Sequence, residues 1–208
     1  MEYKKAEIEL TVIKKIMEDS RRINIDNGIH YIFWGVLVTI ALLINYIMLL
    51  TNTNANYIGM IWFILMISGA IIDMLIGRKQ SRTAKVHTYA GSILGSLWLA
   101  SGIAMFMFGF LGTMTKAYNP IFISPIISVS LGISYFTSGA IQQINWLRNI
   151  SFGWWIGAAI MFIFPSIHTL LIFAIMMICL QVIPGIMLNK KSKREISEES
   201  NFLNQDEV

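Results

Sequence analysis

An apolar run followed by a basic connection, YIGMIWFILMISGAIIDMLIG at residues 57–77 and then RKQSRTAK at 78–85, decides the fold of this chain. The run has about the 20 residues that a helix needs to cross the hydrocarbon core of a bilayer. The positive charges directly after it are typical of a cytoplasmic helix end, because Lys and Arg gather on the cytoplasmic side. Together they predict a transmembrane helix that ends in the cytoplasm.

Further apolar runs of similar length fill the centre of the chain, at residues 29–50, 87–112, 119–141, 150–165 and 167–188. If all six runs cross the membrane, every one of the sixteen Lys and Arg residues except Lys116 falls on the same side. The positive-inside rule then places both termini in the cytoplasm. We predict an all-α, polytopic membrane protein with six transmembrane helices, arranged as three hairpins over residues 29–188.

The composition excludes several classes of protein. Charged residues make up 13% of the chain, against about 25% in ordinary soluble domains. The basic pI near 9.2 does not indicate nucleic-acid binding, because the basic residues lie at predicted helix ends, where they meet lipid headgroups. Membrane lipids are therefore expected partners and nucleic acid is not. Residues 1–28 lack the apolar core of a signal peptide, so we expect no cleavage there.

Two segments flank the predicted membrane domain. Residues 1–28 have an apolar stripe at helical spacing, formed by Ala6, Leu10, Ile13 and Met17. Basic and acidic groups balance over this segment, which favours packing against protein over adsorption to anionic lipid. We predict a cytoplasmic amphipathic helix that docks on its own membrane domain or on another subunit. Residues 189–208 are expected to form a disordered cytoplasmic tail.

Small residues mark the places where helices are expected to pack closely. Gly91 and Gly95 form one pair at four-residue spacing, and Gly153 and Gly157 form another. Such pairs let two helix backbones approach within a membrane. They also fit a weak hairpin repeat of about 60 residues. Packing within the bundle is the favoured interpretation of these glycines. As partners of the whole protein, besides membrane lipids, we expect a second copy of the chain or a cytoplasmic or membrane protein.

Short motifs link the chain to two families. Trp34-Gly35 in the first run, the basic connection 78–85 and Ile183-Pro184-Gly185 at the end resemble an uncharacterised family of six-span bacterial membrane proteins of the Bacteroidota type. That resemblance implies a multi-pass protein of the bacterial inner (plasma) membrane, without an assigned activity. More distantly, the segment from Trp154 to Gly185 is similar to the hairpin repeat of HdeD-like acid-resistance membrane proteins.

Asp73 is the only acidic residue inside any predicted span. A charged group in the membrane is costly, so it is a functional candidate by default. The alternative is that Asp73 reaches the interface or pairs with a nearby cation. Further polar residues gather at the same predicted cytoplasmic ends, and the candidate binding layer is His30, Tyr31, Asp73, His87, Gln142, Arg148 and Gln181.

The sequence gives no sign of a catalytic site or a bound cofactor. His30 and His87 begin spans on the cytoplasmic side, whereas His168 begins one on the outer side, so these three cannot share one metal ion. Intramembrane hydrolysis needs a nucleophile with its base or two carboxylates, and neither set is present. We therefore expect no enzyme activity, no metal and no cofactor.

Two functions remain after these exclusions. The first is a non-enzymatic, accessory or regulatory membrane protein that binds a partner or a lipid at its cytoplasmic face. The alternative is a small transporter or channel with Asp73 near a cytoplasmic gate. A conduit should be polar along its whole length, whereas the polar residues here gather at one end.

Overall fold

The computed structural model describes residues 27–83 and 89–205. Every element in these ranges is a helix. The main helices are α2 (Ile29–Leu50), α3 (Ala55–Thr83), α4 (Tyr89–Phe106), α6 (Ile123–Ile141), α7 (Asn145–Ile163), α8 (Thr169–Met177) and α9 (Ile183–Gln205). The short elements are the π-turns η1 (Met107–Leu111) and η3 (Ile178–Val182), helix α5 (Gly112–Met114) and the 3-10 turn η2 (Pro120–Phe122).

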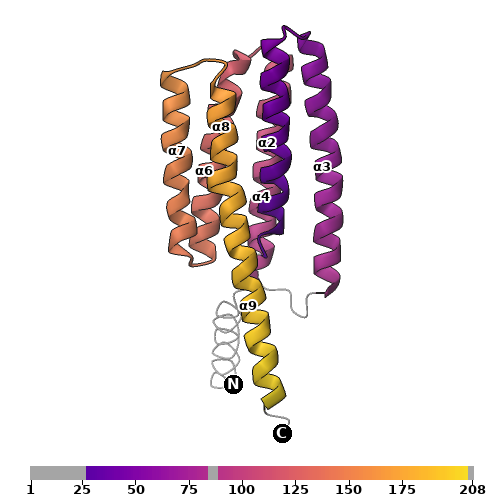
Figure 1. Cartoon of the computed structure of the whole chain (residues 1–208), viewed down its shortest axis with the longest axis vertical. Coiled ribbons are helices and arrows are strands. Elements are labelled where there is room, and N and C mark those ends of the chain that lie inside the picture. The colour runs from indigo at the N-terminus through magenta and orange to yellow at the C-terminus, as the bar shows by residue number, and fades with distance from the viewer. Residues whose placement is uncertain (1–26, 84–88, 206–208) are drawn as a thin grey trace, which may run out of the picture.

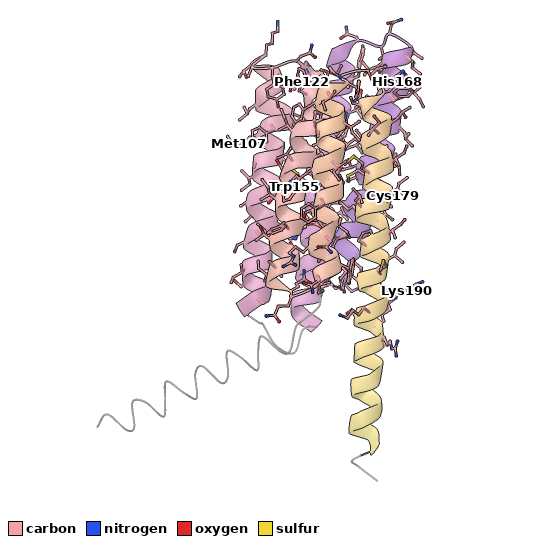
Figure 2. All side chains as sticks on the ribbon, turned by 90° about the vertical axis from the view of Figure 1, so that its left-hand side faces the viewer. Met107, Phe122, Trp155, His168, Cys179 and Lys190 are labelled. Atoms are coloured by element: carbon pink, nitrogen blue, oxygen red, sulfur yellow. The ribbon has the colours of Figure 1, made fainter. Side chains whose placement is uncertain are left out.

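The helices stand side by side in one bundle, and α2, α3, α4, α6, α7 and α8 run alternately in opposite directions (Figure 1). Helices α6 and α7 lie on one side, α8, α2 and α4 in the middle, and α3 on the other side. Helix α9 continues the line of α8 beyond the ends of the other helices, as both views show (Figure 2). We call the end where α2 begins, and from which α9 projects, the basal end.

Five helical segments are long and apolar enough to cross a membrane: Ile29–Leu50, Tyr57–Gln80, Ala90–Met114, Pro120–Ile141 and Thr169–Arg194. Helix α7 is not among them, because it begins with the polar side chains of Asn145, Arg148 and Asn149. The prediction of an all-α membrane protein is therefore confirmed for the described residues, while the sixth crossing stays a prediction. The predicted amphipathic helix of residues 1–28 lies almost wholly outside the described residues.

The start of α2 is pressed against the start of α9. Gly28 has a φ of +69°, and a side-chain carbon there would lie 2.1 Å from the backbone oxygen of Gly185. Two turns further along α2, a side-chain carbon at Gly35 would lie 2.6 Å from Val182. The side-chain amide of Asn189 also donates to the backbone oxygen of Asn27, at 2.7 Å. Glycine at these positions therefore allows α2 and the α8–α9 line to touch along their backbones.

Helices α6 and α7 make the most extensive pairing in the bundle. A side-chain carbon at Gly139 of α6 would lie 2.3 Å from the backbone nitrogen of Arg148 on α7. Nearer the start of α6, the hydroxyl group of Ser128 donates to the backbone oxygen of Trp154, at 2.8 Å. The three-hairpin prediction assigns these two helices to different hairpins, so the tightest contact does not follow the predicted repeat.

The turn between α6 and α7 ends the first helix with a Schellman motif. Gln143 has a φ of +53°, and the backbone N–H of Ile144 donates to the oxygen of Gly139 at 2.9 Å. The same pattern ends α2 at Asn52 and α5 at Lys116, both with positive φ. These caps satisfy backbone carbonyls that a helix end would otherwise leave open. They also turn the chain sharply, which keeps the connections short.

The predicted packing glycines do not behave alike. A side-chain carbon at Gly157 would lie 2.2 Å from the end of Met176, and one at Gly153 would lie 3.1 Å from Leu180. Both therefore serve the contact of α7 with the α8–η3 segment. Gly95 has no atom within 4 Å of such a carbon, and Gly91 is also exposed. The prediction of close packing within the bundle is wrong at Gly95, because α4 turns that face outward.

The expected disorder of the C-terminal segment 189–208 is wrong as far as Gln205. Helix α9 continues without a break from Ile183 to that residue. Its start is fixed against α2, and nothing in residues 189–205 interrupts a helix, since they hold neither Pro nor Gly.

We predict that Gly139→Ala destabilises the protein, because the new methyl group meets the backbone of Arg148, which cannot move aside as a flexible side chain can. Overpacking of this kind costs about 1–3 kcal/mol. Thermal unfolding of the purified protein in detergent measures the effect. Gly95→Ala is the matched control, since it faces open space and should leave the melting temperature unchanged or slightly raised. Equal losses in both variants would contradict the packing described here.

Candidate functional site

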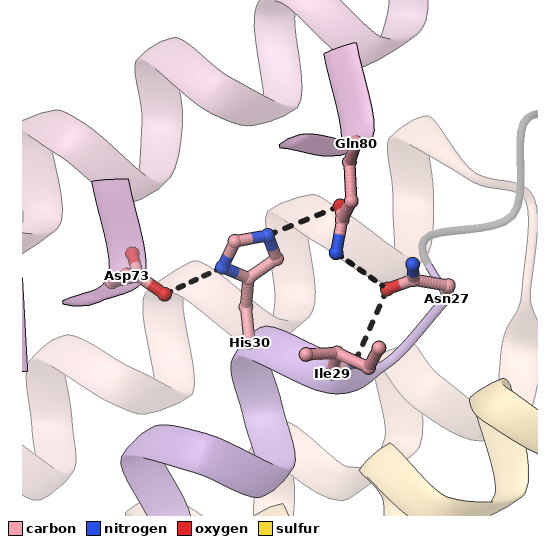
Figure 3. Close-up of polar contacts among 5 residues, drawn as sticks. All are labelled: Asn27, Ile29, His30, Asp73 and Gln80. Atoms are coloured by element: carbon pink, nitrogen blue, oxygen red, sulfur yellow. Dashed lines mark hydrogen bonds and ion pairs between the residues drawn. The ribbon is translucent and has the colours of Figure 1, made fainter. Parts of the chain in front are cut away.

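A chain of polar contacts joins α2 to α3 at the basal end (Figure 3). The Nδ1 atom of His30 lies 2.5 Å from Oδ1 of Asp73, and its Nε2 atom lies 3.3 Å from Oε1 of Gln80. The Nε2 amide group of Gln80 donates to Oδ1 of Asn27, at 3.4 Å. The backbone N–H of Ile29 donates to the same oxygen, at 3.2 Å. We call Asn27, His30, Asp73, Gln80 and Asn189 the basal network.

The backbone of α2 fixes which groups donate in this network. Because the N–H of Ile29 can only donate, the side-chain atom of Asn27 that faces it is the oxygen. Gln80 must then present its NH2 group to Asn27 and its oxygen to His30. The imidazole of His30 thus faces an oxygen atom on each nitrogen. Each ring nitrogen of His30 therefore contacts one polar side chain of α3, and the tautomer of the ring decides which of them donates.

The structure pairs Asp73 with His30, which lies on a different helix. Among the described residues, its only ion pair is with His30. The two side chains are 29% and 28% exposed, so the pair lies at the edge of the bundle. The contact therefore favours the structural interpretation of Asp73, in which a side chain of a neighbouring helix pairs with it.

Other members of the predicted polar layer lie inside the bundle. Tyr31, the residue after His30 on α2, is 3% exposed. Its ring contacts Trp98 of α4 and Tyr135 of α6, with ring centroids 5.2 and 5.5 Å apart. Tyr135, which is fully buried, also contacts Trp154 of α7, at 6.0 Å. These four aromatic rings connect α2, α4, α6 and α7 in the basal half of the bundle.

Two buried glutamines and one serine border these rings. Gln142 is 2% exposed, Gln181 is 4% exposed and Ser138 is fully buried. Ser138 and Gln142 follow Tyr135 by three and seven positions on α6, so all three share one helix face. Gln181 lies beside Gly35, one turn from Tyr31. We call Trp98, Ser138, Gln142, Trp154 and Gln181 the buried cluster; Tyr31 and Tyr135 lie between its members.

The structure thus divides the predicted binding layer into two parts. His30 and Asp73 form the surface part, whereas Tyr31, Gln142 and Gln181 point to the interior. Arg148 is half-buried at the tight turn between α6 and α7. His87 lies outside the described residues. His168 lies at the opposite end of the bundle (Figure 2), where its Nδ1 atom is 3.1 Å from the hydroxyl of Tyr46.

Several members of the two groups were not predicted from the sequence. Gln80 could have been found, because it follows Asp73 by seven residues and therefore shares its helix face. Asn27 and Asn189 carry no such signal, since their contact depends on how α9 approaches α2. Ser138 looks like any small residue of a membrane helix, and only its burial distinguishes it.

Neither group has the composition of a metal site. Among the residues that the structure describes, no three His, Cys, Asp or Glu side chains come together. No protein-family model, curated protein or solved structure matches the chain. The function must therefore be inferred from these two groups of residues and from the surface around them.

We predict a measurable energetic coupling between His30 and Asp73. Four proteins are needed: the wild type, His30→Gln, Asp73→Asn and the double variant. Exposed ion pairs contribute about 0–1 kcal/mol and breaking a buried one costs about 3–5 kcal/mol. For this half-buried pair we expect a coupling of about 1 kcal/mol, measured by denaturant unfolding in detergent.

His168→Gln is the matched control, because this histidine lies at the other end of the bundle. Combined with Asp73→Asn it should give additive losses. Additive losses for His30→Gln with Asp73→Asn as well would show that the contact contributes nothing to stability.

Proposed function

We propose that this protein crosses a bacterial inner membrane six times, with the basal end in the cytoplasm. The five apolar helices support this reading. Helix α7 runs the length of the bundle beside α6 (Figure 1), so a crossing of α6 implies one of α7. The basal end carries Arg78, Lys79 and the basic residues of α9, which favour the cytoplasmic side.

We further propose a non-enzymatic, accessory or regulatory role, in which the basal face binds a partner or anionic lipid. The observation that carries this proposal is the exposed positive charge at the start of the projecting part of α9. Lys190, Lys191 and Lys193 are exposed there, and Arg78 is exposed at the end of α3. Surfaces of this kind attract anionic headgroups and acidic protein segments. The projecting length of α9 adds a surface beyond the lipid for a protein partner.

The position of Asp73 gives less support to the transporter alternative. Helix α3 packs mainly on α2, and only 6% of its apolar window is buried. A gate on this outermost helix would have no opposing wall except α2. We therefore propose that the basal network holds α3 against α2 and so supports the binding face.

The six-crossing arrangement predicts the location of reporters fused at single positions. Fusions after Asn54, Lys116 and Ser166 should report the outside, and fusions after Arg82, Asn145 and Lys193 should report the cytoplasm. Ser166 is decisive, because it follows α7. A cytoplasmic signal at Ser166 together with an outside signal at Lys116 would show that α7 does not cross.

The binding proposal predicts a specific effect of charge reversal on α9. The triple variant Lys190→Glu, Lys191→Glu, Lys193→Glu should lose most of its bound anionic lipid or protein partner, because repulsion replaces attraction. Purification from native membranes, with quantitative mass spectrometry of lipids and proteins, measures this loss. Lys116→Glu at the opposite end is the control and should keep the same partners. Identical partner profiles in both variants and the wild type would reject the basal face as the binding surface.

A further inference from the structure

The buried cluster contains six polar atoms that have no hydrogen-bond partner in the protein. They are Nε1 of Trp98, Oγ of Ser138, Nε2 and Oε1 of Gln142, Nε1 of Trp154 and Oε1 of Gln181. Unpaired polar groups inside a protein are costly and rare. Within a lipid-surrounded bundle the cost is high, because bulk water does not reach them. Such a concentration in one region therefore calls for a partner that is not part of the chain.

These atoms belong to side chains that neighbour the linked rings of Tyr31 and Tyr135 in the basal half of the bundle. The rings of Trp98 and Trp154 both contact the ring of Tyr135. Ser138 and Gln142 continue the face of α6 that carries Tyr135. Gln181 adjoins the face of α2 that carries Tyr31, and the rings of Tyr31 and Tyr135 are in contact. Five helical segments thus contribute side chains to this polar region.

The hydroxyl group of Ser138 differs from its neighbours on α6. Ser130, Ser134 and Thr137 each donate to the backbone oxygen four residues earlier, at 2.9–3.1 Å. The same kind of acceptor is available to Ser138, yet its hydroxyl makes no hydrogen bond. It is therefore held away from its own helix and remains available to another molecule.

The position of Gln181 has a structural cause in the sequence. Pro184 has no backbone N–H, and its ring displaces the carbonyl of the preceding turn. The chain forms the π-turn η3 directly before it, and Gln181 is the one buried residue of that turn. Turns of this type are rare and often occur at functional sites. Pro184 thus follows directly after a distorted stretch of helix, and Gln181 is buried within that stretch.

The unpaired atoms define the chemistry of a ligand. The two indole N–H groups and the amide group of Gln142 donate, whereas the oxygens of Gln142, Gln181 and Ser138 accept. None of these groups is ionisable at physiological pH, so the cluster offers no compensating charge to an ion. A fitting ligand is small and uncharged, and it both donates and accepts hydrogen bonds.

We propose that the buried cluster is an internal binding site for such molecules, namely water or a small organic molecule with hydroxyl or amide groups. This site is distinct from the basal face, since its members lie within the bundle and carry no charge. A test of this site is therefore independent of a test of partner binding at the basal face.

The hydrogen-bonding state of the two indoles provides a direct test. Ultraviolet resonance Raman spectra of the full-length protein in lipid nanodiscs report whether a tryptophan N–H is hydrogen-bonded. Difference spectra against Trp98→Phe and Trp154→Phe isolate the two residues, and Trp155, which donates to Val129 at 3.4 Å, is the bonded reference. Both spectra are recorded after extensive dialysis and again after addition of glycerol or acetamide.

We expect both indoles to be hydrogen-bonded. Bonding in the dialysed sample identifies water as the ligand, whereas bonding that appears only with glycerol or acetamide identifies an organic ligand. If either indole stays unbonded under all conditions, the proposal is overturned.

Measurements of the melting temperature give a second test, because an occupied site and an empty site predict changes in different directions. If the site is occupied, Gln142→Leu and Ser138→Ala each remove a partner of the ligand, and the melting temperature should fall by about 2–4 °C. If it is empty, both changes remove unpaired polar atoms from the interior, and the melting temperature should stay equal or rise. Ser130→Ala is the control for Ser138→Ala, because it removes a hydroxyl that bonds only to its own helix. A melting temperature that rises or stays unchanged in both test variants would overturn the proposal. If one variant does not fold, the other variant decides.

Discussion

The backbone contact between α2 and the α8–η3–α9 line is the constraint on which both groups of functional residues depend. Gly28 and Gly35 on one side and Gly185 on the other leave no room for side-chain carbons between them. The contact fixes the rotation of α2 about its own axis. As a result, His30 faces α3 at the edge of the bundle, while Tyr31, the next residue, faces the centre. A wider separation of these helices would release the basal network and the buried cluster together.

The two groups solve the problem of polar side chains in a membrane in different ways. The basal network pairs a carboxyl group with a histidine and completes the remaining contacts with three amide side chains and the backbone. Its charges stay partly exposed at the end of the bundle, where desolvation is limited. The buried cluster lies deeper and avoids charge altogether, and its unpaired atoms point to small uncharged molecules as its partners. One group therefore joins helices, and the other is suited to hold a ligand.

Much of the architecture can be predicted from the sequence, because a membrane restricts which backbone structures can cross it. The apolar run 29–50 coincides with α2, and the helical run that ends at Ile141 coincides with the end of α6. Packing contacts are less readable. Gly91-x-x-x-Gly95 and Gly153-x-x-x-Gly157 are the same pattern, yet Gly153 and Gly157 pack against another helical segment whereas Gly95 faces open space. A four-residue spacing places two glycines on one face of a helix, but it does not say which direction that face takes.

The sequence by itself determined the all-helical class, the approximate bounds of the long helices and the gathering of polar residues at one end. These properties follow from helix length and hydropathy, which are local. The tertiary structure alone decided that His30 is the partner of Asp73, that Gln142 and Gln181 turn inward, and that Gly95 faces outward. The physical reason is that pairing and burial depend on the rotation and separation of whole helices. Those are set by contacts between residues far apart in sequence, such as Gly28 with Gly185 and Gly139 with Arg148.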